Sequence, residues 1–282
     1  MAVPDVLWHY TDAAGLQGIL ESGVLRLTDV RFLNDRSERT YGFTTARSIV
    51  ADMVRAGEVD GDIIEQTYAT LTAAGQRFYI CSLSEHCDVL SQWQRYAADG
   101  YGYCIGFEAK ELVTVGGLES NEVHLPELAH RSDILEPTLL RQMLYDSPAQ
   151  LEKIRRCVSE VLRQTKGREL APIYLFAALE QVALQFKNPL FADEHEWRLI
   201  QHGGYETRQF IHFSAKGHYV RPFVATHKQL DGKAILPVRG IVCGPRLEDD
   251  LAAEAVRELL TVNNYSVYDI DVRRSRLHGT WR

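Results

Sequence analysis

The segment RFYICSLSE, residues 77–85, limits the fold most strongly, because its pattern has the two-residue period of a β-strand. Its side chains divide between two faces: Phe78, Ile80, Ser82 and Ser84 on one, and Tyr79, Cys81 and Leu83 on the other. A helix-like segment, residues 88–100, and a second strand-like segment, residues 101–108, follow directly. We therefore expect strands and helices to alternate irregularly, as in α+β proteins.

The rest of the chain supports this class. Asp12 is placed to cap a helix that Gly23 ends, and residues 24–29 alternate as a half-buried strand does. Residues from about 136 to 185 have a helical pattern, and the C-terminal part reads strand, turn, helix, strand. We predict a single domain, residues 1–282, with a mixed or antiparallel sheet, flanking helices and a helical insertion at roughly 136–185.

Composition sets broad limits on function. The chain has 282 residues, of which 45% are apolar and 24% charged, as in ordinary globular proteins. A net charge of -7 argues against non-specific coating of nucleic acid. The 5 cysteines are scattered without a CxxC pair, which favours a reduced, cytoplasmic protein. No secretory signal or membrane-spanning run is visible, so we expect no membrane association.

The stretch HYT, residues 9–11, is the first with unusual polar chemistry. On a strand, His9 and Thr11 share one face and Tyr10 takes the other. His9 is either a half-buried ring that bonds to the backbone or the first part of an active site. The stretch FLNDRSE raises a similar choice, because Asn34, Asp35 and Glu38 suit both a helix start and a binding site.

Two further stretches carry candidate residues. In CSLSEHCDVLSQWQRYA, Ser82 and Ser84 end a strand face, and Asp88 is placed to cap the next helix. Trp93 and Tyr96 lie three apart on that helix, where they form either core or one wall of a pocket for a flat ring.

In DEHEWRLI, residues 193–200, Glu196 and Arg198 point to one side of a predicted strand and Trp197 to the other. The two charged side chains form either a simple ion pair or part of a cleft in which Arg198 orients Glu196.

Several common signatures are missing. The chain has no GxxxxGK[ST] phosphate loop, no GxGxxG, no HExxH and no GxSxG. Its histidines lack the spacing of metal ligands, so we expect no metal.

Taken in order, these stretches resemble a bacterial family known as domain of unknown function 2971. Its members share HYT before a helix, an LND..E segment, a block of the form SLS...D.L..W..YA....G.CIGF, an EWR strand and a late GP turn. The matching positions here are His9–Thr11, Leu33–Asp35 with Glu38, Ser82–Phe107, Glu196–Arg198 and Gly244–Pro245. The helical stretch at 136–185 carries none of these motifs.

The N-terminal HYT..AGLQGILESGVL also resembles the DarT-type and tRNA-phosphotransferase-like branches of the ADP-ribosyltransferase superfamily. That resemblance implies an ADP-ribosyltransferase-like fold and NAD as the substrate. It also implies site residues: His9 would bind a ribose of NAD, Ser82 and Ser84 would line the nicotinamide pocket with Trp93 or Tyr96, and Glu196 would be catalytic. From the residues themselves, we add Thr11 to the NAD-binding set and Arg198 to Glu196 in catalysis. We assign Asn34, Asp35 and Glu38 to binding of the acceptor. The superfamily's third motif, which carries the catalytic glutamate on a late strand, does not occur here in its standard form. Arg198, beside Glu196, has no counterpart in the superfamily pattern.

Three functions remain open from the sequence. The first is an NAD-consuming ADP-ribosyltransferase or NAD glycohydrolase, an effector in phage defence or a toxin pair, whose acceptor is a protein or a nucleic acid. Its carboxylate would stabilise an oxocarbenium-like sugar. The second is a non-enzymatic sensor or interaction module of a bacterial defence system. The third is a metal-dependent nuclease that uses Asp35, Glu38, Asp193 and Glu196.

Overall fold

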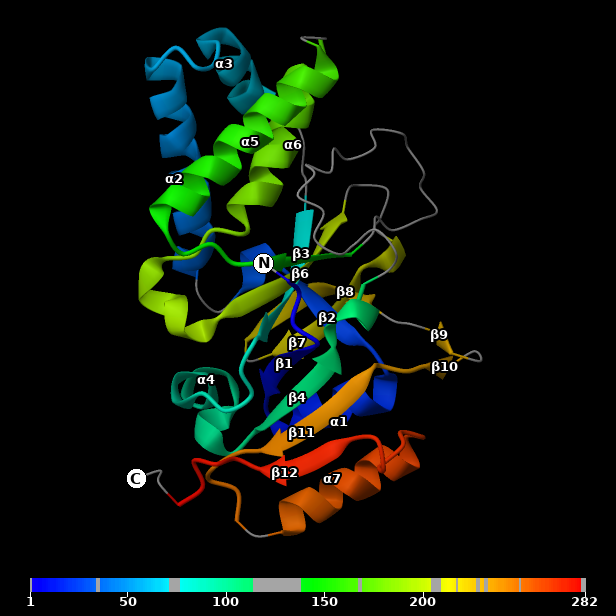
Figure 1. Ribbon diagram of the computed structural model, residues 1–282. Coiled ribbons are helices and arrows are strands. Elements are labelled where there is room, and N and C mark those ends of the chain that lie inside the picture. The colour runs from blue at the N-terminus through cyan, green and yellow to red at the C-terminus, as the bar shows by residue number, and fades with distance from the viewer. Residues whose placement is uncertain are drawn as a thin grey trace.

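The structure is a computed structural model that describes residues 2–33, 36–70, 77–113, 138–166, 169–203, 209–216, 218–226, 229–230, 233–248 and 250–279. It has an α+β architecture in which helices flank one large sheet (Figure 1). The α-helices are α1 (Ala13–Ser22), α2 (Arg36–Arg55), α3 (Gly61–Thr70), α4 (Leu90–Tyr96), α5 (Ser147–Thr165), α6 (Ala171–Ala183) and α7 (Leu251–Val262).

The strands of the large sheet are β1 (Val6–Thr11), β2 (Leu25–Asp29), β3 (Arg77–Ser84), β4 (Tyr103–Glu108), β5 (Leu139–Gln142), β6 (Glu196–Gly203), β7 (His212–Lys216), β8 (Tyr219–Thr226), β11 (Val238–Cys243) and β12 (Asp271–Arg274). A small separate hairpin joins β9 (Gln229–Leu230) to β10 (Lys233–Ala234). Short 3-10 helices are η1 (Val30–Phe32), η2 (Ala98–Gly100), η3 (Ala109–Glu111) and η4 (Pro189–Glu194).

The sheet is mixed, as predicted. Its main path runs β12-β11-β4-β1-β3-β2-β8-β7, and β6 pairs with β3 on one side and β5 on the other. Among the described strands, β11 and β12 pair in parallel, and the other pairs of this sheet are antiparallel. Strand β3 thus contacts β1, β2 and β6, which makes it the strand where the two parts of the sheet meet.

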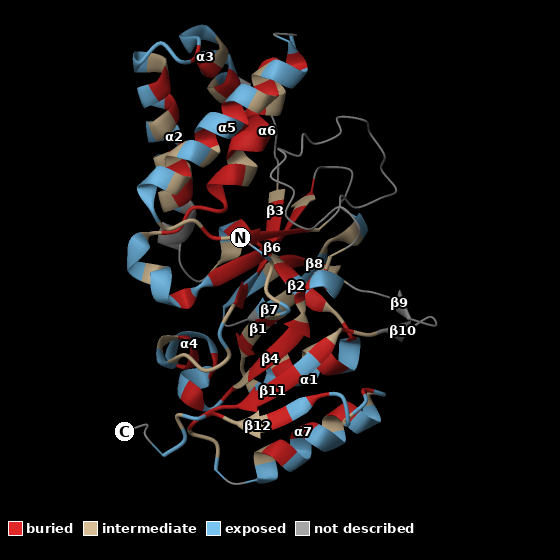
Figure 2. Cartoon of the chain, in the orientation of Figure 1, coloured by how far each residue is buried: buried red, intermediate tan, exposed pale blue. Residues whose placement is uncertain are grey.

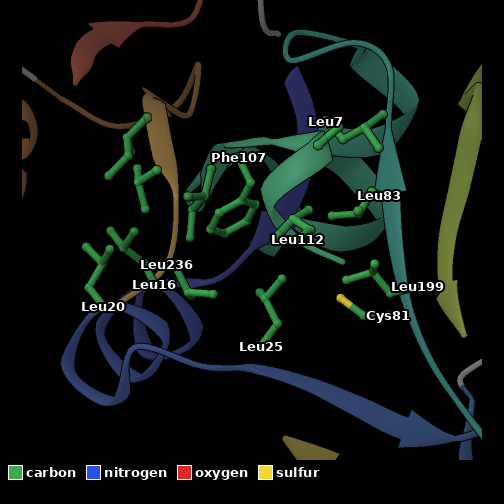
Figure 3. Close-up of a cluster of buried hydrophobic side chains, with 14 of the residues drawn as sticks. Leu7, Leu16, Leu20, Leu25, Cys81, Leu83, Phe107, Leu112, Leu199 and Leu236 are labelled. Atoms are coloured by element: carbon green, nitrogen blue, oxygen red, sulfur yellow. The ribbon is translucent and has the colours of Figure 1, made fainter. Parts of the chain in front are cut away.

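The side-chain alternation predicted for β3 is present. Tyr79 and Cys81 belong to the main hydrophobic core, and Phe78 and Ile80 belong to a separate buried cluster on the opposite face. The main core also takes residues from α1, β1, β11 and α7. Figure 3 shows Leu7 of β1 and Leu16 and Leu20 of α1 among the side chains of this core. Because both faces of β3 are covered, the register of this strand against β6 is strongly specified.

Helix α1 begins and ends as its sequence predicts. The Asp12 carboxylate accepts a hydrogen bond from the Gly15 amide at 2.7 Å, and Gly23 ends the helix in a left-handed conformation with φ 64°. A side-chain cap of this kind stabilises a helix by about 1 kcal/mol. Asp12 follows β1 directly, so the cap also fixes where the strand ends.

Helices α2, α3, α5 and α6 pack together at one end of the sheet (Figure 1). Their inward faces form a second hydrophobic core around Val50, Ile154, Leu175 and Val182, while their outer faces are exposed (Figure 2). This helical layer combines α5 and α6 with two helices from residues 36–70, so it is larger than the insertion expected from the sequence.

Two local expectations differ from the structure. The stretch predicted as a helical insertion contains α5 and α6, as expected, but it also includes β5, which pairs with β6 and carries a buried Arg141. Asp88 does not cap α4, whose N-cap residue is Val89. The Asp88 carboxylate instead accepts hydrogen bonds from the Trp93 indole at 2.8 Å and the Ser275 hydroxyl at 2.6 Å. Tertiary partners thus compete successfully for a side chain that local sequence assigns to a cap.

Within the described residues, the helices are all too short or too polar to cross a bilayer.

Candidate functional site

A cavity opens where the two parts of the sheet separate. Strand β1 pairs with β4 along its whole length but meets β3 at one described pair, Trp8 with Ser84. Further along β3, the neighbour is β2, through Thr28 with Ile80 and Asp29 with Tyr79. The space between these contacts forms a cavity of about 290 Å³, close to the lower end of the range for small-molecule sites.

Five of the residues predicted from the sequence line this one cavity: His9, Thr11, Ser82, Tyr96 and Glu196. They come from β1, β3, α4 and β6, so segments far apart in the chain contribute to it. The structure therefore brings the first-strand histidine and the late-strand glutamate to the same place.

The other predicted residues lie outside the lining. Ser84 is buried, and its hydroxyl donates to the Glu194 carbonyl at 2.8 Å. Trp93 is fully buried and packs edge-to-face against Tyr10, with ring centroids 5.1 Å apart, so it is core and not a cavity wall. Arg198 is not among the lining residues, and it donates to the carboxylate of the lining residue Glu196.

The predicted acceptor-binding residues lie outside the described part of the chain: Asn34 and Asp35 entirely, and Glu38 in its side chain. The residue directly before them, Leu33, lines the cavity.

The Glu196 carboxylate is the centre of a buried ion cluster. Its Oε1 accepts from Arg198 Nε at 2.7 Å, and its Oε2 accepts from Lys187 Nζ at 2.6 Å and Arg198 NH2 at 3.1 Å. All three side chains are at most 4% exposed. Because each carboxylate oxygen accepts about two hydrogen bonds, Oε1 keeps acceptor capacity for one more donor.

This environment fixes the charge of Glu196. Burial acts to raise the pKa of its carboxyl, but the neighbouring Arg198 and Lys187 cations outweigh burial and lower the pKa to about 2. Glu196 is therefore ionised at neutral pH. Such a carboxylate is a fixed hydrogen-bond acceptor and a poor general base, since a useful base titrates near the working pH.

Glu194 extends the cluster along the cavity lining, and sequence reasoning missed it. Its side chain is 3% exposed and accepts from Lys187 Nζ, from Arg95 NH1 at 2.8 Å and from the Tyr96 hydroxyl at 3.2 Å. Both residues precede β6: Glu194 is the last residue of η4, and Lys187 lies two residues before η4 begins. Their spacing matches no periodic pattern, so only the tertiary structure shows that they meet.

His9 is oriented by the backbone of β3. Its Nδ1 lies 3.0 Å from the Ser82 carbonyl oxygen, which can only accept a hydrogen bond. Nδ1 therefore carries the proton, and Nε2 is the acceptor atom of the neutral ring. The ring is a positioned hydrogen-bonding group: it bonds to the backbone, as the first sequence interpretation of His9 expects. It also lines the cavity, and its role in an active site stays a prediction.

The charges around the cavity favour an anionic ligand. Four cationic side chains line it, together with three carboxylates; the cations are Arg26, Arg95, Lys187 and Arg221, and the carboxylates are Asp12, Glu194 and Glu196. Lys187 and Arg95 are engaged by the two glutamates, and Asp12 by the helix cap. Arg26 and Arg221 come from the neighbouring strands β2 and β8, so positive charge is concentrated on that side.

These features define an α+β protein with a mixed sheet and a polar cavity built on a buried ion cluster. Residues 92–199 match the model of a family described as protein of unknown function (DUF2971). The matched stretch runs from within α4 to within β6, and it contains the residues of the ion cluster: Arg95, Lys187, Glu194, Glu196 and Arg198. Neither a search of curated proteins nor a search of solved structures gave a significant match.

Proposed function

We propose that the cavity binds NAD and that the protein cleaves its nicotinamide glycosidic bond, as an ADP-ribosyltransferase or an NAD glycohydrolase. One observation carries the proposal: His9, Ser82 and Glu196 line the same cavity, although they lie on three different strands. The proposal requires these residues at one cavity, so His9 and Glu196 on opposite sides of the core would have excluded it.

In this proposal Glu196 orients the substrate. Its Oε1 accepts a hydrogen bond from a hydroxyl of the ribose that is attached to nicotinamide, and Arg198 and Lys187 hold the carboxylate in place. Departure of nicotinamide leaves positive charge on that ribose, as in glycoside hydrolysis. Lys187 and Arg198 cancel much of the electric field of the Glu196 carboxylate. We therefore propose that Glu196 mainly positions the ribose, and that it contributes less to electrostatic stabilisation of the positive charge.

His9 and the cationic side of the cavity bind the rest of the molecule. The acceptor atom Nε2 of His9 suits a ribose hydroxyl, and Arg26 and Arg221 suit the two phosphates. Tyr96 lines the cavity with an exposed ring, and it provides a surface on which the nicotinamide stacks. The position of His9, Ser82 and Glu196 around one cavity also supports our proposal that the α+β core is ADP-ribosyltransferase-like.

The buried cluster disfavours the nuclease alternative. Both oxygens of Glu196 are occupied by cationic donors, and the Asp193 carboxylate accepts from the Ser91 hydroxyl at 2.7 Å. A divalent cation at Glu196 would lie beside the positive charges of Lys187 and Arg198, which repel it.

We further propose that the protein is a cytoplasmic effector in phage defence or in a toxin pair, and that its acceptor is a protein or a nucleic acid.

The test is release of nicotinamide from NAD, measured by chromatography. We expect turnover by the natural protein and a loss of at least about 100-fold in Glu196→Gln and His9→Ala, with unchanged far-ultraviolet circular dichroism. Glu58→Gln, which alters an exposed carboxylate on the helical layer, is the matched control and should keep full activity.

Absence of nicotinamide release with any acceptor, together with absence of NAD binding in calorimetry, would contradict the proposal. That result would favour the non-enzymatic module, in which the cluster only stabilises the fold.

A further inference from the structure

Three side chains with metal-binding atoms meet beside the ion cluster, outside the cavity lining. Glu85, His86 and His195 each place a carboxylate oxygen or ring nitrogen within 4.8 Å of the others. Both histidines are exposed, and their rings lie edge-to-face with centroids 4.6 Å apart. Nearby ring nitrogens and a carboxylate are the donor set of many zinc sites.

The pairing of β3 with β6 explains why these residues meet. Ser84 is the register partner of Glu196, so the next residues outward are Glu85 and His195. The Glu85 amide donates to the His195 carbonyl at 3.1 Å, which extends the ladder by this pair. His86 follows directly, and its position is fixed by its own carbonyl, which accepts from the Tyr10 hydroxyl at 2.9 Å.

Glu85 is oriented as metal ligands usually are. Its Oε1 accepts from the Trp197 indole Nε1 at 2.8 Å and from Gln142 Nε2 at 3.1 Å. Both bonds fall on one oxygen, so we assign Oε2 to the metal. Hydrogen bonds of this type from outside the ligand set orient a carboxylate ligand.

The backbone at His195 is also unusual. It has φ 43° and ψ 50°, in the left-handed region that non-glycine residues seldom adopt. A conformation of this kind is retained where the surrounding structure requires it, and here it presents the imidazole beside His86.

We propose that Glu85, His86 and His195 form a binding site for a transition-metal ion of the zinc class, with the remaining coordination position open to water. Imidazole nitrogen selects such an ion over Mg²⁺ or Ca²⁺, which prefer oxygen ligands. Ligand atoms around tetrahedral zinc lie roughly 3.3 Å apart. Small rotations of two exposed imidazoles therefore bring the three donor atoms together.

A metal here would join the two segments that hold the proposed substrate cavity. His195 lies between Glu194 and Glu196, and Glu85 follows Ser84, whose hydroxyl donates to the Glu194 carbonyl. Binding would fix the end of β3 to the start of β6 at the residues next to the ion cluster. The site is independent of the proposed NAD chemistry, and the spacing of its residues along the chain gives no sign of it.

The experiment is calorimetric titration of untagged, EDTA-treated full-length protein with Zn²⁺, supported by Co²⁺ absorption spectra and thermal unfolding. We expect one Zn²⁺ per chain, a tetrahedral Co²⁺ spectrum, a higher Tm with Zn²⁺ and no such effect of Mg²⁺. His86→Ala and His195→Asn should each weaken binding by about 10-fold or more. Asparagine is chosen because it tolerates the left-handed backbone.

Two controls separate this site from others. His218→Ala removes an exposed histidine outside the cluster and should bind Zn²⁺ as the natural protein does. Cys87→Ser tests a nearby thiol and should also retain binding. Absence of Zn²⁺ binding, or binding that survives His86→Ala with His195→Asn but is lost in Cys87→Ser, would overturn the proposal.

Discussion

Lys187→Met is the substitution that most sharply tests the buried ion cluster. Methionine keeps the length of the side chain but removes the cation that bonds Glu194 and, at 2.6 Å, Glu196. Two carboxylates, each at most 4% exposed, then keep Arg95 and Arg198 as their cationic partners among the described residues. Removing one partner of a buried ion pair costs about 3–5 kcal/mol, so we expect a loss of that size in the free energy of unfolding at pH 7.

The loss should depend on pH in a defined direction. The native pKa of Glu196 is lowered from 4.5 to about 2, so the stability it contributes is present above pH 4.5 and is lost as the pH falls toward 2. At about 1.4 kcal/mol per pKa unit, that contribution is about 3 kcal/mol. Without Lys187 the pKa of Glu196 rises, and the variant takes up a proton at higher pH. The difference between the two proteins should therefore shrink between pH 7 and pH 4.

Urea unfolding followed by tryptophan fluorescence measures both effects, since Trp93 and Trp197 are fully buried. Glu194→Gln added to Lys187→Met should recover about 2 kcal/mol, because it removes one of the uncompensated charges. Arg155→Met, at an exposed ion pair with Glu58, is the control and should leave the free energy of unfolding nearly unchanged. A cost for Lys187→Met that matched the control, or did not change with pH, would refute this account of the cluster.

Two further predictions concern β1 and α1. A Cβ added at Gly15 would lie 1.9 Å from Thr11 Oγ1, so Gly15→Ala should lower the free energy of unfolding by about 1–3 kcal/mol and weaken NAD binding by displacing Thr11. A Cβ added at Gly18 on the same helix meets no atom within 4 Å, so Gly18→Ala should instead raise the free energy of unfolding by about 0.5–1 kcal/mol. Urea unfolding measures both variants, and equal effects of the two substitutions would contradict this prediction. Tyr10→Phe removes an acceptor 3.0 Å from the Val89 amide and should cost about 1–3 kcal/mol, seen as a lower Tm, whereas an unchanged Tm would contradict this assignment.

The parts of the fold that local patterns specify could be predicted from the sequence. The alternation along β3, the cap of α1 at Asp12 and its end at Gly23 depend on residues close in the chain, and all three are confirmed. Tyr10 was assigned to the face opposite His9, and it is buried. Where a tertiary partner outweighs a local preference, as at Asp88, the local prediction is wrong.

The site could be predicted only in part, for a related reason. Strand parity placed Glu196 and Arg198 on one face, and their ion pair is present. Lys187 and Glu194 follow no period, and their buried charges are acceptable only because they meet each other and Arg95. The opening between β1 and β3 depends on the order of strands in the sheet, which a local pattern does not determine.

A crystal structure of the protein with NAD, or with an analogue that resists cleavage, tests the central claim most directly. The account predicts ligand density in the cavity between β1, β3 and β6, with a hydroxyl of the nicotinamide ribose about 2.6–3.2 Å from Glu196 Oε1. It also predicts a hydroxyl of the other ribose at the same distance from His9 Nε2. Ligand density elsewhere on the protein, or an empty cavity at saturating NAD, would contradict it.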